Sequence, residues 1–209
     1  EKAPDKFPGM IVKIFAFAGA ESLVLSESAS LTVEKALLNI GESFPLLEEV
    51  HTEFHSIINR NAGFGETFRL MHKHGFLEKL IPEFGGISWH YQYDFYHAFT
   101  TDEHSIRTVE VLEKIDEGKM TGVQELTEMM KDITARGALM LAALLHDIGK
   151  AGGHGHSVRG ERLASKALER LGCDERTIDT VKFLIREHLV MSHISQRRDM
   201  DDPQIIEDF

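Results

Sequence analysis

Cysteine is almost absent from this chain: among its 209 residues, only Cys173 carries a thiol. One cysteine excludes an intrachain disulfide and any zinc site that requires several thiolates. This composition is typical of a reducing compartment, so we expect a cytoplasmic protein rather than a secreted one. Histidine, with 12 copies, is the remaining candidate for binding a transition metal.

Long hydrophobic runs are missing as well. No stretch reaches about 18 apolar residues, the length that a membrane-spanning helix needs, so we expect a soluble protein with no membrane partner. The apolar residues 7–20 contain Lys13 and two glycines. They partly resemble a signal peptide, but charges precede them and no cleavage pattern is clear. We expect instead that this segment belongs to a processed or truncated chain and packs on the core.

Basic residues are in deficit, since 23 Lys and Arg stand against 34 Asp and Glu and leave a formal net charge of −11 at pH 7. The acidic residues are spread along the chain, and no basic stripe is evident that would neutralise a nucleic-acid backbone. We therefore expect no nucleic-acid partner that is bound through unspecific charge.

Apolar residues make up 42% of the chain, which is ample for one large hydrophobic core and one main domain. Residues 1–30 mix prolines, glycines and apolar residues without a clear period. We interpret them as an irregular N-terminal segment or the remnant of a neighbouring domain. From Leu31 onward, apolar residues recur at helical spacing, which predicts an all-α helical bundle over residues 31–209.

The predicted helices are bounded by glycines and by residues that favour helix ends. Residues 136–148 are almost wholly apolar, so we expect them to form the central buried helix, which Gly149 ends. Residues 118–128 are acid-rich and are predicted to form an exposed link, and residues 76–101 an aromatic loop. The other main helices are predicted over residues 66–74, 101–115, 160–171 and 174–189.

His146 and Asp147 stand at the polar end of this apolar helix. A buried imidazole or carboxylate that is left without a partner costs several kcal/mol, so something must satisfy both side chains. One explanation is a metal ion, on which adjacent residues at a helix end can converge. The other is a histidine that caps the helix beside a surface aspartate.

Further histidines and one late aspartate follow in order on different predicted elements, each beside apolar or glycine-rich sequence. Without a thiolate, such a set forms a nitrogen and oxygen shell suited to Mn, Fe, Co, Ni or Zn, with Mg possible but less favoured. Six ligands can hold one or two divalent ions, and two ions can orient a water, lower its pKa and neutralise a phosphoryl group. The candidate metal ligands are His104, His146, Asp147, His156, His188 and Asp199.

This ordered pattern resembles the HD superfamily of metal-dependent phosphohydrolases, whose members carry a histidine, a His-Asp pair, further histidines and a late aspartate. The resemblance implies a core metal site formed by the first histidine, the His-Asp pair and the late aspartate. It implies that His156 and His188 either complete a second site or contact the phosphate. These two histidines are also the candidates for proton transfer.

Two cations are candidates for contact with the substrate. Lys150, in the segment HDIGK, either holds phosphate or the leaving group, or is a cation that a helix C-terminus favours. Arg197, with Arg198 beside it, either grips phosphate or balances the acidic tail. The aromatic residues of the stretch 89–96 either stack on a base or belong to the core.

A narrower resemblance covers the chain from about residue 54 to residue 209. This region is similar to the central region of PII uridylyltransferase/uridylyl-removing enzymes, through LMHKHGFLEKLIPEFGGI (70–87), YQYDFYHAFTTDEHSIR (91–107), LAALLHDIGK (141–150), HSVRG (156–160) and REHLVMSHISQRRDMDDPQII (186–206). In that family the HD region hydrolyses a phosphodiester, which removes uridylyl groups from a tyrosine of the PII nitrogen-signalling protein and releases UMP. The resemblance implies this substrate here.

The chain also departs from that family. It contains no Gly-Ser nucleotidyltransferase motif with paired aspartates and no ACT regulatory domains, so we do not expect it to transfer UMP by itself. Gly155 stands where members often carry an aspartate. Two other functions stay open: an HD nucleotidase that acts on a small free nucleotide, and a non-catalytic metal-binding regulatory module.

Overall fold

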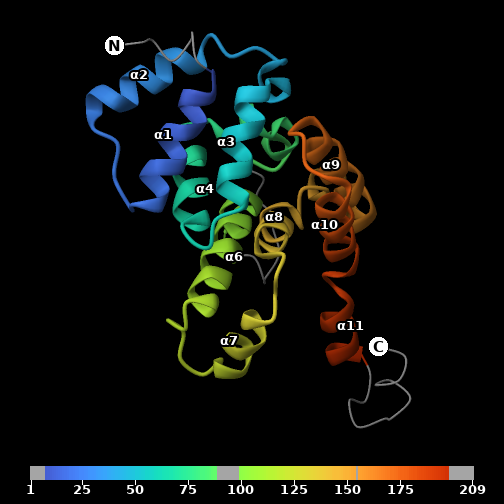
Figure 1. Cartoon of the computed structure of the whole chain (residues 1–209). Helices are drawn as coiled ribbons and strands as arrows, with labels where there is room; N and C mark the ends of the chain where they lie inside the picture. The colour runs from blue at the N-terminus through green and yellow to red at the C-terminus, as the bar shows by residue number, and fades with distance from the viewer. Residues whose placement is uncertain (1–7, 89–98, 154, 198–209) are drawn as a thin grey trace.

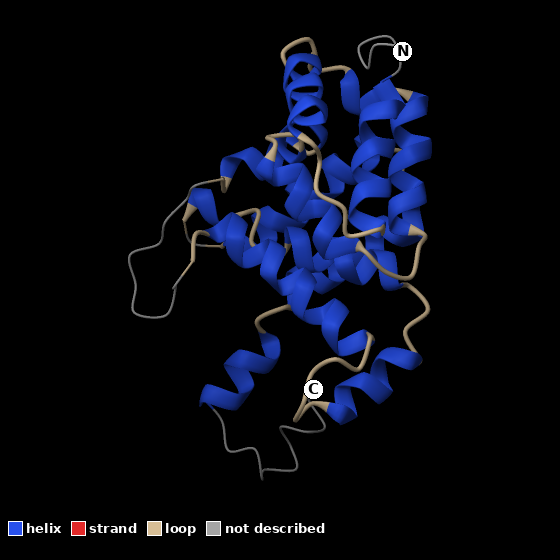
Figure 2. Ribbon diagram, turned by 90° about the vertical axis from the view of Figure 1, so that its left-hand side faces the viewer, coloured by secondary structure: helices blue, strands red, loops and turns tan. Residues whose placement is uncertain are grey.

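A computed structural model describes residues 8–88, 99–153 and 155–197 of the chain, with the backbone alone for residues 196 and 197. Within these ranges every regular element is a helix, as the colours of Figure 2 show. The prediction of an all-α fold is therefore confirmed. The helices enclose one hydrophobic cluster, which extends along the chain from Ile11 to Ile185.

The N-terminal helices stand together on one side of the molecule (Figure 1). In this group α1 packs on both α3 and α4. Ile11, Val12 and Phe15 of α1 are almost fully buried, so this segment packs on the core as expected. The elements of the group are α1 (Pro8–Ala20), α2 (Glu27–Leu37), η2 (Phe44–Leu46), α3 (Glu48–Ile58) and α4 (Phe64–Lys73).

The prediction of an irregular N-terminal segment does not hold for residues 8–20, because they form α1. Pro8 is the first residue of this helix, a position where the missing N–H of proline costs no helical hydrogen bond. Gly19 allows α1 to approach α4 closely, since a Cβ at Gly19 would lie 2.0 Å from the Thr67 Oγ1 atom. The interpretation of residues 1–30 as the remnant of a neighbouring domain stays a prediction.

The central helices are α6 (Thr101–Asp116), α7 (Gln124–Lys131) and α8 (Arg136–Leu145). As predicted, α8 is largely buried, and it contacts α3, α6 and α10. It ends at Leu145, so the His-Asp pair lies in the turn of residues 146–149 that follows, here called the His-Asp turn. Residues 124–128 are mostly exposed, as predicted, but they are not an irregular link, because they belong to α7, which packs on α6.

The C-terminal helices are α9 (His156–Arg170), α10 (Glu175–Glu187) and α11 (Val190–Arg197). α9 and α10 lie side by side, and α10 also packs on α8 (Figure 1). The Asp174 carboxylate accepts a hydrogen bond from the Thr177 N–H at 2.9 Å, which confirms the predicted start of α10. α9 begins earlier than predicted, because Gly155 takes a left-handed conformation, with φ of 73°, just before it.

Short elements connect these groups: α5 (Leu77–Leu80), η3 (Pro82–Gly86) and η4 (Lys150–Gly152). η4 follows the His-Asp turn and leads into the loop before α9. No described helix is both long and apolar enough to cross a membrane.

Candidate metal centre

Four helix ends bring predicted histidines together. His104 lies in the first turn of α6, and His146 follows the last residue of α8. His156 is the first residue of α9, and His188 follows the last residue of α10. The ring centroids are 5.2 Å apart for His104 and His146, 5.2 Å for His146 and His188, and 5.5 Å for His188 and His156.

Asp147 lies among these rings and is only 2% exposed. Its Oδ2 atom is 3.1 Å from His146 Nε2 and 3.8 Å from His104 Nε2. Its Oδ1 atom is 3.8 Å from His156 Nε2 and 3.9 Å from His188 Nε2. The site therefore has a first half (His104, His146, Asp147) and a second half (Asp147, His156, His188), which share one carboxylate. In each half, the ligand atoms lie within 4.8 Å of one another.

Backbone carbonyls fix the orientation of two of these rings. His146 Nδ1 lies 2.8 Å from the Ala143 carbonyl oxygen, and His188 Nδ1 lies 2.7 Å from the Ile185 carbonyl oxygen. A carbonyl oxygen only accepts, so the neutral imidazole carries its proton on Nδ1, and Nε2 keeps a lone pair. A histidine whose other nitrogen donates to a carbonyl in this way is oriented to bind a metal ion.

The donor set fits a divalent transition metal. The buried Asp147 Oδ1 and His156 Nε2 atoms have no hydrogen-bond partner among the described residues. A buried polar atom that stays unpaired costs about 1–3 kcal/mol, and a cation between two such acceptors would remove this cost. Imidazole and carboxylate ligands without sulfur suit Mn, Fe, Co, Ni or Zn. Capping by His146 alone would leave this convergence of histidines unexplained.

Burial and charge set the protonation states that a metal site needs. Burial alone would raise the pKa of Asp147, but its contacts with His146 and with the Lys150 ammonium lower that pKa below its usual range. Burial lowers the pKa of both His156 and His188, so their neutral forms predominate near neutral pH. An ionised carboxylate and neutral imidazoles are the forms that bind a metal ion.

Lys150 lies at the edge of the cluster. Its Nζ atom is 2.8 Å from Asp147 Oδ2, and its side chain is 12% exposed. The ammonium therefore interacts with the shared carboxylate, beside the place where an anionic substrate would meet the histidines. Its contact with phosphate remains a prediction.

Some predicted site residues fall outside the described part of the chain. They are Asp199, Arg198 and the aromatic stretch 89–96. Arg197 is the last residue of α11, but only its backbone is described. Metal ligation by Asp199 and phosphate binding by Arg197 therefore remain predictions.

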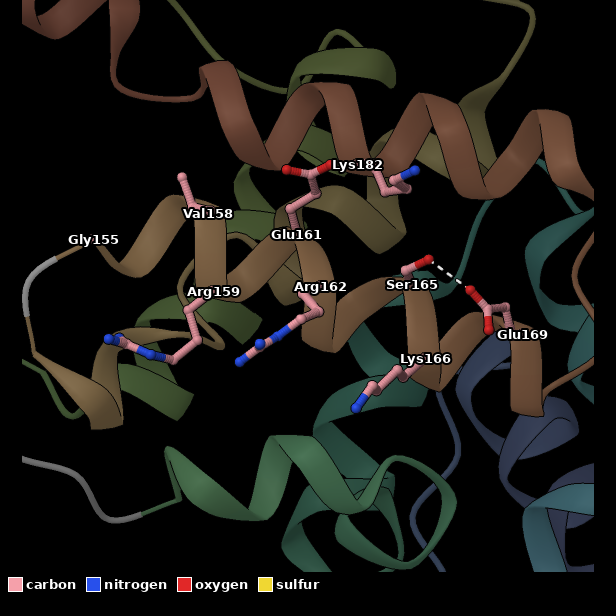
Figure 3. A pocket seen from close by; sticks show the side chains of 9 residues that line it. All are labelled: Gly155, Val158, Arg159, Glu161, Arg162, Ser165, Lys166, Glu169 and Lys182. Carbon is pink, nitrogen blue, oxygen red and sulfur yellow. Dashed lines mark hydrogen bonds between the residues drawn. The ribbon is translucent and has the colours of Figure 1, made fainter.

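Next to the second half of the site, a groove of about 650 Å³ runs along α9 from Gly155. Arg159, Arg162 and Lys166 line it and point to the same side of α9 (Figure 3). Arg162 and Lys166 are exposed and have no ion-pair partner within the described ranges. The sequence analysis missed this basic face, because only helical spacing of three to four residues brings the cations together.

Comparison with known proteins assigns the family. A family model described as HD domain matches residues 101–207, a range that contains the whole cluster. The chain belongs to the HD domain family. Its fold and its His/Asp cluster identify an HD-domain phosphohydrolase, and the cluster suggests divalent metal binding.

Relatives of this HD domain match nearly the whole chain, which confirms the predicted resemblance. Three of them carry the name bifunctional uridylyltransferase/uridylyl-removing enzyme. The relative from Phenylobacterium zucineum is 36% identical over 203 residues, that from Azospirillum brasilense 33% over 200, and that from Caulobacter vibrioides 35% over 203. The alignments cover 95–97% of this chain but only 21–22% of each relative, so the chain spans about a fifth of their length.

Proposed function

We propose that this HD domain hydrolyses a phosphodiester in a metal-dependent reaction, and that its substrate is a uridylylated protein of the PII type. The products are UMP and the unmodified protein. Family membership and the His/Asp cluster support the reaction class. The relatives support the substrate, because their name includes a uridylyl-removing activity.

The observation that carries this proposal is the carboxylate that both halves share. His104 and His146 would hold one divalent ion together with Asp147 Oδ2. His156 and His188 would hold a second ion together with Oδ1. When bound, such ions supply Lewis-acid polarisation of the phosphoryl group and a more acidic water molecule.

The residues around the cluster supply binding and proton transfer. Hydrolysis forms a bond from phosphorus to the water oxygen and breaks the bond from phosphorus to the tyrosine oxygen, which leaves with a proton. Lys150 can donate from Nζ to a phosphoryl oxygen, because its ammonium lies beside the shared carboxylate. His156 is held neutral by burial, so it can accept the proton of the water if the centre holds one ion only.

The groove along α9 supports a protein as the substrate. Lys166 lies ten residues beyond His156 on this helix, which corresponds to about 15 Å along its axis. A uridylyl group held at the cluster would not extend along this whole face. Arg162 and Lys166 are therefore placed to contact acidic side chains of a protein substrate, which a chain of net charge −11 would otherwise repel.

Metal analysis and hydrolysis of two diesters test the proposal. The diesters are bis(p-nitrophenyl) phosphate and uridylylated PII, with the wild type compared with Asp147→Asn. Asp179→Asn is the matched control, because Asp179 is an exposed carboxylate of α10 whose partner is Lys182. We expect Asp147→Asn to lose bound metal and to lower kcat/KM for both diesters by more than about 100-fold. The control should behave as the wild type.

Other outcomes would favour the alternatives. Hydrolysis of small nucleotides, with no activity toward uridylylated PII, would favour an HD nucleotidase. A folded wild type that binds metal but cleaves neither diester would favour the non-catalytic metal-binding module, and one that also binds none of Mn, Co, Fe and Zn would refute the metal centre itself.

A further inference from the structure

The His-Asp turn and the first turn of α9 touch through backbone atoms. A Cβ placed on Gly149 would lie 2.2 Å from the His156 carbonyl oxygen and 2.7 Å from the Gly160 nitrogen. Only glycine permits this approach, because any side chain would overlap α9. The contact places Asp147, two residues before Gly149, next to the first residue of α9.

The segment between these two turns, here called the loop 149–153, contains the short helix η4. It is held internally by two weak bonds, from the Gly152 N–H to the Gly149 carbonyl at 3.3 Å and from the Gly153 N–H to the Lys150 carbonyl at 3.1 Å. Residues 151–153 are Ala-Gly-Gly and are exposed, and Gly153 takes a left-handed φ of 78°. Glycine has wide conformational freedom, so the entropy cost of ordering this loop is high. These internal bonds do not fix the position of the loop relative to α9, so a side-chain contact from α9 adds to its order.

Arg159 of α9 makes such a contact. Its Nη1 atom donates hydrogen bonds to the Gly149 carbonyl at 2.8 Å and to the Gly153 carbonyl at 3.3 Å, the two ends of the loop. Its guanidinium also packs against Gly152, where a Cβ would lie 2.5 Å from Arg159 Cζ. Figure 3 shows the Arg159 side chain reaching away from α9 on the side of Gly155.

We propose, on the basis of the proposed function, that Arg159 is a positioning residue of the metal centre. It holds the loop 149–153 against α9, and it thereby sets the separation between Asp147 Oδ1 and the histidines of the second half. Arg159 does not touch the reacting atoms in this role. It acts indirectly, because it determines the position of His156 relative to Asp147.

The two histidines of the first half do not depend on this contact, and Asp147, which both halves share, lies only two residues beyond the end of α8. His104 belongs to α6, and His146 is oriented by the Ala143 carbonyl of its own helix. His156 Nε2, in contrast, has no hydrogen-bond partner among the described residues, so the position of α9 determines where it lies. Loss of Arg159 should therefore weaken metal binding in the second half alone.

A calorimetric titration of the intact chain with Mn²⁺ tests this selectivity without a substrate. The wild type is expected to bind two ions, and His104→Ala and His156→Ala assign the two binding steps to the two halves. Arg159→Met should weaken the second half by about 10- to 100-fold, the range observed when an outer contact of a metal ligand is lost. The first half should keep its affinity.

Two further variants sharpen the result. Arg176→Met removes an exposed cation of α10 that donates no hydrogen bond to residues 149–153, so both affinities should equal those of the wild type. Arg159→Lys should recover part of the lost affinity, because an ammonium can still donate to one of the two carbonyls. If thermal unfolding shows that Arg159→Met is not folded, the comparison of Arg159→Lys with the wild type replaces it, with a smaller loss confined to the second half.

The proposal is overturned if the wild type binds one ion, if Arg159 variants leave both affinities unchanged, or if they weaken both halves equally. Hydrolysis of bis(p-nitrophenyl) phosphate, measured in parallel, separates this proposal from the proposed function. Selective weakening in a chain that cleaves no diester supports the role of Arg159 and refutes the hydrolase. Diester cleavage by the wild type, together with unchanged metal binding in Arg159→Met, supports the hydrolase and refutes the role of Arg159.

Discussion

Replacing Gly149 by alanine tests whether the metal centre depends on the contact between the His-Asp turn and α9. The added Cβ would start 2.2 Å from the His156 carbonyl oxygen, whereas ordinary contacts lie at 3.4–4 Å. The two segments must therefore separate by about 1 Å. Overpacking of this kind lowers the free energy of unfolding by about 1–3 kcal/mol.

The same displacement should reach the metal ligands. Metal–ligand distances tolerate deviations of only about 0.2 Å, so a shift of His156 relative to Asp147 should weaken the second half more than the first. Urea unfolding of the metal-free chain measures the first effect, and titration with Mn²⁺ measures the second. Gly41→Ala is the control, since a Cβ there meets nothing within 4 Å. A Gly149→Ala chain that matches this control in both assays would refute the reasoning.

Three further predictions concern pH, the groove and the N-terminal helix. The hydrogen bond with Glu78 raises the pKa of His72, so the stability it contributes should be complete below about pH 6.5 and lost as pH rises through the folded pKa. In urea unfolding the wild type should lose more stability over this rise than His72→Gln, and parallel curves would contradict the assignment. Arg162→Glu combined with Lys166→Glu should raise KM for uridylylated PII by about tenfold or more and leave bis(p-nitrophenyl) phosphate unaffected; an unchanged KM for the protein would exclude the groove from binding. Gly19→Val should lower the free energy of unfolding by about 1–3 kcal/mol, and a wild-type thermal midpoint would argue against close packing of α1 on α4.

The centre of the site was predictable because buried polar groups need partners. His146 and Asp147 at the end of an apolar helix required such partners, and other histidines of the chain supplied them. The division of the site into two halves was not predictable, because it depends on which oxygen of Asp147 faces which ring. The proposed role of Arg159 was not predictable either, because it depends on a contact with the loop 149–153 that no sequence pattern indicates.

Two helices escaped prediction for different reasons. In α1, Pro8 and Gly19 suggested irregular structure, but they allow helix initiation and close packing. In α7, the acidic residues make a short apolar face hard to recognise in the sequence, and Met130 is its only buried residue. Packing on α6 stabilises this helix. Local preference was misleading at both places because tertiary contacts stabilise the helix.

Each described histidine of the cluster stands at a helix end, and these ends lie at separate positions of the chain between residues 104 and 188. An unfolded chain would not hold these ends together, so an ion bound there would add its binding free energy to folding, about 2.7 kcal/mol at a free concentration of 100 times Kd. Proteases cleave the open form of a protein, and its population would fall by a corresponding factor. The supply of metal in the cell would then govern the lifetime and abundance of this protein as well as its catalytic rate.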